Sequence, residues 1–186
     1  MANLQSNPWS FTSTDPATAA ITSITLNADG TVTVVTTGAL TFNTALYTSE
    51  VGVEPPLGFT VIGVTNTVYI GFYYLITGAS GGTTFILKPQ FNIAAGTAAS
   101  SGGTIAQCLY RQYVRIEDMS WQATNTGTGV TSGVLFLTDR SGNTIWQSAI
   151  GATGAFGQLN RGKLFWVNGF TPITIPINSI VLVTID

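Results

Sequence analysis

The side chains that most often carry out chemistry in proteins are scarce in this sequence. It has no histidine, which is the commonest general base and metal ligand, and its one cysteine is Cys108. Cys108 lies in the apolar stretch AQCLYRQY, where a buried, unreactive thiol is expected rather than a nucleophile. We therefore expect no enzyme activity, no metal, no cofactor and no disulfide.

Eight acidic residues are the remaining candidates for chemistry. Glu50 and Glu54 could form the carboxylate pair of a glycosidase, but they flank VGV ahead of two prolines with no aromatic platform beside them. A solvated loop is the better interpretation of that pair. Glu117 and Asp118 are consecutive, so on a strand they point to opposite faces and cannot share a substrate.

The low charge of the chain excludes several classes of partner. Only 8% of the 186 residues are charged and the net charge is −2, so a basic surface for nucleic acid is not expected. The chain is 45% apolar, which excludes disorder, and much of the rest is threonine, glycine and serine. These proportions predict a folded protein with a nearly neutral surface.

The uncharged stretch from Phe59 to Thr77 has to be either a membrane span or part of a packed β structure. Gly63, Asn66 and Gly71 interrupt it and no basic residue flanks it, which argues against a span. We predict two strands, Phe59–Val64 and Val68–Ile76, that are apolar on both faces. One face would meet the core, and the other a second sheet or another chain. Phe72 and Tyr74 are therefore candidate interface residues.

Turn chemistry between alternating segments predicts an all-β fold. Asn27–Gly30 separates two β-branched runs, and Asp139–Gly142 separates two more. Near the end, TPITIPINS contains Pro172 and Pro176, which predict an edge strand or loop, and SIVLVTID predicts a buried closing strand. We expect an antiparallel β-sandwich, jelly-roll-like, with a second small β-barrel-like module as an alternative to a single sandwich.

Composition divides the chain into four parts. We expect an N-terminal arm (1–20), an N-terminal β module (21–92), a small-residue linker or loop (93–109) and a C-terminal β-sandwich module (110–186). The arm carries Trp9 and Phe11, which would pack either in a groove on a neighbouring chain or on their own domain. Its first residues have neither the basic nor the apolar region of a secretory signal, so none is expected.

The segment YRQYVRIED is a second candidate for an interface. On a strand it places Arg111, Tyr113 and Arg115 on one face, which is either a polar seam against a partner or a solvated outer face. Trp121, Trp146 and Trp166 each lie in an apparent strand, so packing in a core or an interface is favoured over a sugar platform.

Several of these segments together resemble a known class of protein. The arm NPWSFTSTDP, the hairpin ITSITLNADGTVTVVTTGALTF and the closing ITIPINSIVLVTID resemble the small virion proteins of tailed bacteriophages, most of all head decoration or cement proteins. The resemblance implies a homodimer or homotrimer, made in the host cytoplasm, that binds the major capsid protein on the capsid surface and stabilises the shell. It implies no nucleic acid or membrane partner. The alternative is a glycan-binding adhesin, or a module of a tail fibre or spike.

Overall fold

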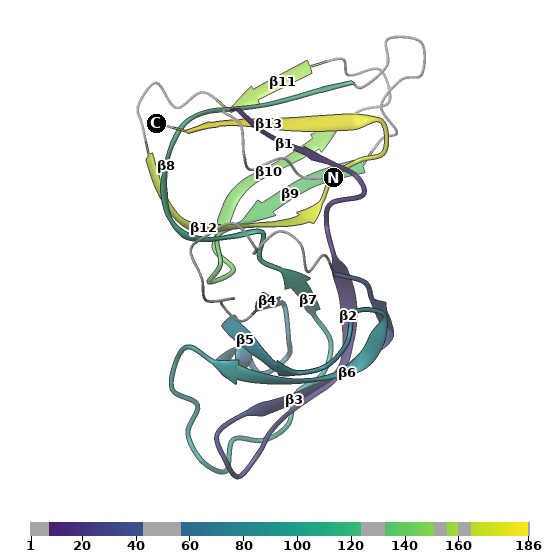
Figure 1. The fold of residues 1–186 in the computed structure, drawn as a ribbon, viewed down its shortest axis with the longest axis vertical. Helices are drawn as coiled ribbons and strands as arrows, with labels where there is room; N and C mark the ends of the chain where they lie inside the picture. Colours follow the sequence, from purple (N-terminus) through teal and green to yellow (C-terminus); the bar gives the residue numbers. More distant parts are fainter. Residues whose placement is uncertain (1–7, 43–56, 124–132, 151–155, 160–164, 186) are drawn as a thin grey trace. The chain divides into compact units, whose positions relative to one another are not determined.

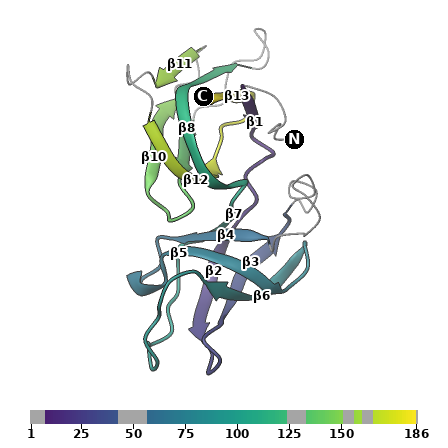
Figure 2. The same cartoon turned by 60° about the vertical axis from the view of Figure 1, so that its left-hand side comes forward.

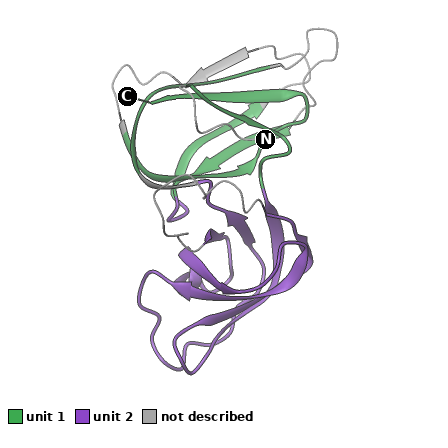
Figure 3. Ribbon diagram, in the orientation of Figure 1, with its two compact units in different colours: residues 1–16, 111–139, 143–186 green, residues 17–110, 140–142 purple. Residues whose placement is uncertain are grey.

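The structure is a computed structural model that describes residues 8–42, 57–123, 133–150, 156–159 and 165–185. The predicted all-β class is confirmed, because the described elements are strands and one short 3-10 helix. The chain divides into two compact units: unit 1 comprises 1–16, 111–139 and 143–186, and unit 2 comprises 17–110 and 140–142 (Figure 3). No helix in the described ranges is long and apolar enough to cross a membrane.

Each unit is built from strands that Figure 1 labels in chain order. The strands of unit 2 are β2 (Thr18–Leu26), β3 (Val32–Leu40), β4 (Gly58–Ile62), β5 (Gly71–Thr77), β6 (Gly82–Pro89) and β7 (Thr104–Gln107), and its 3-10 helix is η2 (Thr67–Tyr69). The strands of unit 1 are β1 (Trp9–Thr12), β8 (Tyr110–Ala123), β9 (Gly133–Thr138), β10 (Thr144–Ile150), β11 (Phe156–Leu159), β12 (Phe165–Thr174) and β13 (Ser179–Ile185).

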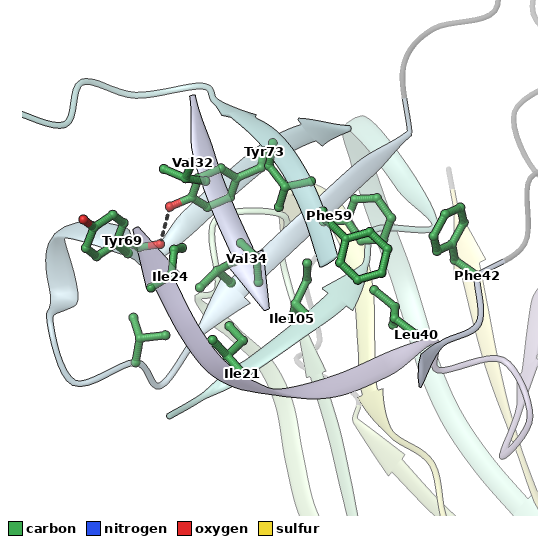
Figure 4. Close-up of a cluster of buried hydrophobic side chains, with 14 residues drawn as sticks. Ile21, Ile24, Val32, Val34, Leu40, Phe42, Phe59, Tyr69, Tyr73 and Ile105 are labelled. Carbon is green, nitrogen blue, oxygen red and sulfur yellow. Dashed lines mark hydrogen bonds between the residues drawn. The ribbon is translucent and has the colours of Figure 1, made fainter. Parts of the chain in front are cut away.

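Unit 2 is a closed barrel in which the strands follow the order β2-β3-β6-β5-β4-β7. All six neighbouring pairs, including the closing pair β7–β2, are antiparallel. Alternate side chains of these strands fill the interior, where Ile24, Val34, Phe59, Tyr73 and others form one apolar cluster (Figure 4). Closure leaves the barrel without an unpaired edge along which another chain could add a strand.

The turn predicted between β2 and β3 is present. The amide of Gly30 donates to the carbonyl of Asn27, 3.1 Å away, and Gly30 has a φ of +79°, which favours glycine. The Asp29 carboxylate accepts from both the amide and the hydroxyl of Thr31, at 3.0 and 2.6 Å. These local bonds explain why the two threonine-rich strands pair in this register.

The path of the chain in unit 2 differs from the predicted one at two places. The second strand of the uncharged stretch begins at Gly71 rather than at Val68, because the side chain of Asn66 caps η2 by accepting from the amide of Val68. The small-residue segment 93–109 is not a free linker. It contains β7, and Ser100 exchanges backbone hydrogen bonds with Ile24, each 2.9 Å long.

Unit 1 is one antiparallel sheet in the order β1-β13-β8-β12-β9-β10, with β11 paired to β8 off this path. The long strand β8 curves strongly (Figure 2), and the sheet closes over its own apolar side chains. Residues 1–7 of the predicted arm lie outside the described residues. The rest of the arm is divided, since β1 pairs with β13 in unit 1 whereas β2 begins the barrel at Thr18.

The segment with the two prolines was predicted as an edge strand or loop, and this is right for Pro176, which lies in the loop between β12 and β13, but wrong for Pro172. Pro172 lies in β12, between β8 and β9, and is opposite Leu137 of β9. The ladder shifts register between Pro172 and Thr174, and a bulge of this kind accommodates a residue that has no amide hydrogen to donate. The closing strand β13 was predicted correctly, and its residues alternate between buried and partly exposed.

Candidate functional surfaces

The outer face of β4 and of the start of β5 is covered by a turn of the chain itself, rather than by the expected second sheet or other chain, whereas Ile76 of β5 is 54% exposed. Thr60 and Phe72 are cross-strand neighbours on this face, and both are buried. Arg140–Gly142, from the turn between β9 and β10, belong to the same compact unit. The hydroxyl of Thr60 donates to the carbonyl of Arg140 at 2.9 Å, and the Arg140 guanidinium lies 5.4 Å from the centre of the Phe72 ring.

Gly142 makes this close approach possible. A Cβ on Gly142 would lie 2.7 Å from Cγ2 of Ile62, closer than two carbon atoms can come without a shift. Its φ of +90° is also one that glycine tolerates better than other residues. The turn thus contributes both a polar contact and an apolar contact to the outer face of β4.

An open hollow of about 380 Å³ lies beside the turn that contains Arg140. Its walls include Phe72 and Tyr74 of β5, Gln90 and Phe91 after β6, and Arg140 and Ser141. The rings of Phe72 and Tyr74 meet edge to face with centroids 5.1 Å apart, and the amide of Gln90 donates to the carbonyl of Phe72 at 3.0 Å. Phe72 and Tyr74, which were predicted as interface residues, therefore line one hollow. Phe72 is buried and Tyr74 is half-buried.

The basic residues of unit 2 gather at the same hollow. Within residues 17–110 and 140–142 the sequence has two basic residues, Lys88 and Arg140. Arg140 lines the hollow, whereas Lys88 is exposed on β6 directly opposite Tyr74, which also lines the hollow. Sequence reasoning missed this grouping because Lys88 and Arg140 lie far apart along the chain.

The aromatic residues of the predicted arm pack on their own domain. Trp9 is 2% exposed and Phe11 is 0% exposed. Phe11 stacks on Phe170 of β12, with ring centroids 4.7 Å apart and planes 21° apart. Of the two alternatives for the arm, the structure therefore shows packing within unit 1.

The alternation predicted for β8 is present where side chains are described. Val114 and Ile116 are buried, whereas Tyr113 is 65% exposed and Arg115 is partly exposed. The side chain of Arg111 lies outside the described part of the chain. Tyr113 and Arg115 thus share the outer face of β8. Tyr113 is the more exposed of these two residues of the predicted seam.

Of the three tryptophans predicted to pack in a core or an interface, two lie in the core of unit 1. Trp121 and Trp146 are buried, but Trp166 on β12 is 65% exposed. Its neighbour Val167 points into the core, and strand alternation sends Trp166 the opposite way. The sequence could not distinguish the two faces because both neighbours of Trp166 are apolar. Trp166 of β12 and Tyr113 of β8 are thus two large aromatic side chains that are exposed on unit 1.

Cys108 and the acidic residues are the groups that were considered for catalysis or metal binding. Cys108 is fully buried, as predicted. Glu50 and Glu54 lie outside the described residues. Within the described ranges, no three His, Cys, Asp or Glu side chains come together as metal ligands would. The hydrogen bonds from Thr31 lower the pKa of Asp29, which is a property of its turn.

Comparison with known proteins gives no relative from which a function can be carried over. No protein-family model matches the chain, and no curated protein and no solved structure is similar enough to count as a match.

Proposed function

We propose that this protein is a structural component of a virus particle, a capsid decoration or cement protein of a tailed bacteriophage. The observation that carries the proposal is that two aromatic residues of unit 1, Tyr113 and Trp166, are each 65% exposed. Aromatic residues are enriched at protein interfaces relative to the rest of the protein surface, so these two side chains are candidate anchors for a partner.

The low charge of the chain supports the same role. A decoration protein has to bind many equivalent sites on a shell and stay bound. Well-packed apolar interfaces provide that stability, whereas long-range charge mainly speeds association. A protein that binds only the assembled shell also stabilises the shell by mass action. Because only 8% of its residues are charged, this chain is suited to apolar interfaces.

The residues proposed for assembly overlap with those that the sequence favoured, because Tyr113 was already a candidate interface residue. On the β4–β5 pair, Thr60 and Phe72 are buried within unit 2, whereas Ile76 of β5 is 54% exposed. The exposed aromatic residues lie on β8 and β12 of unit 1, which are neighbouring strands of its sheet. We propose that the major capsid protein, or a second copy of this chain in a dimer or trimer, covers Tyr113 and Trp166.

Co-sedimentation of the full chain with shells of the major capsid protein of the phage that encodes it tests this role. We expect the wild-type protein to pellet with shells and to raise their melting temperature. Trp166→Ser and Tyr113→Ser should each weaken binding by about tenfold or more, because aromatic anchors dominate interface energies. Gln147→Ser, on the exposed side of β10, is the matched control and should bind as wild type. A wild-type monomer that shows no affinity for shells would refute the proposal.

A further inference from the structure

We draw no further inference here: the strongest candidate, the outward face of β12 where the buried Oδ1 of Asn168 has no hydrogen-bond partner among the described residues and lies two positions after the exposed Trp166, carries nothing because nothing in the structure shows what group covers it.

Discussion

Phe11 and Phe170 stack face to face although their strands are not neighbours in the sheet of unit 1. The ring centroids are 4.7 Å apart and both side chains are fully buried. In the order β1-β13-β8-β12, two strands separate β1 from β12. Direct contact between the two rings therefore means that the sheet has curved far enough for its inner face to meet itself. The predicted arm is thus part of the core of unit 1.

The stacked pair gives the first prediction. Phe11→Ala removes a fully buried ring and should lower the free energy of unfolding of unit 1 by about 3–5 kcal/mol. Urea denaturation followed by circular dichroism measures this change. The matched control is Trp166→Ala, which removes a larger ring from an exposed position and should change stability by no more than about 0.5 kcal/mol. Equal losses in the two variants would contradict the assignment of Phe11 to the core.

Alanine substitutions at two glycines distinguish the stability cost of backbone strain from that of steric crowding. Gly30 and Gly142 both have positive φ, at +79° and +90°, but a Cβ on Gly30 would meet nothing within 4 Å. Gly30→Ala should therefore cost only the strain of positive φ, about 1 kcal/mol. Gly142→Ala should cost about 1–3 kcal/mol more, because its Cβ would be 2.7 Å from Ile62. Melting temperatures of the two variants test the close packing of the turn on β4, and equal shifts would disprove it.

Tryptophan fluorescence tests the exposure of Trp166 without any binding partner. Among the four tryptophans, Trp9, Trp121 and Trp146 are buried and Trp166 is 65% exposed. We expect acrylamide to quench one component of the emission readily and the rest poorly. Trp166→Phe should remove most of the readily quenched component and the red edge of the spectrum. A dimer or trimer that covers Trp166 would instead protect this component, and dilution should then restore quenching.

The sequence predicted local structure well, but it did not predict which distant segment of the chain packs on the outer face of a strand. The turns at Asn27–Gly30 and Asp139–Gly142 were predictable because their hydrogen bonds join residues no more than four apart. The partner of Thr60 was not predictable, since Arg140 lies 80 residues away and no periodic pattern records which segment covers a strand. The outward direction of Trp166 was hidden for a related reason, because both faces of its strand are apolar in the sequence.

The buried phenol of Tyr73 predicts how unit 2 responds to alkali. Its hydroxyl donates to the carbonyl of Tyr69 at 2.6 Å inside the barrel (Figure 4). Burial raises the pKa of Tyr73 far above its usual value of 10.0, because the phenolate would be desolvated. The unfolded chain loses this proton near pH 10, whereas the folded chain keeps it. The stabilisation is therefore complete below pH 10 and is lost progressively above it.

The expected result is a fall in the free energy of unfolding of unit 2 by about 1.4 kcal/mol for each pH unit above 10. Urea denaturation at several pH values between about 9 and 11 measures this slope. Tyr73→Phe should cost about 1–3 kcal/mol at neutral pH, because the buried Tyr69 carbonyl loses its donor, and should reduce the slope above pH 10. Tyr113→Phe, at an exposed phenol, should leave both quantities nearly unchanged. If the Tyr73→Phe variant kept the wild-type slope, the alkaline loss would arise from another group.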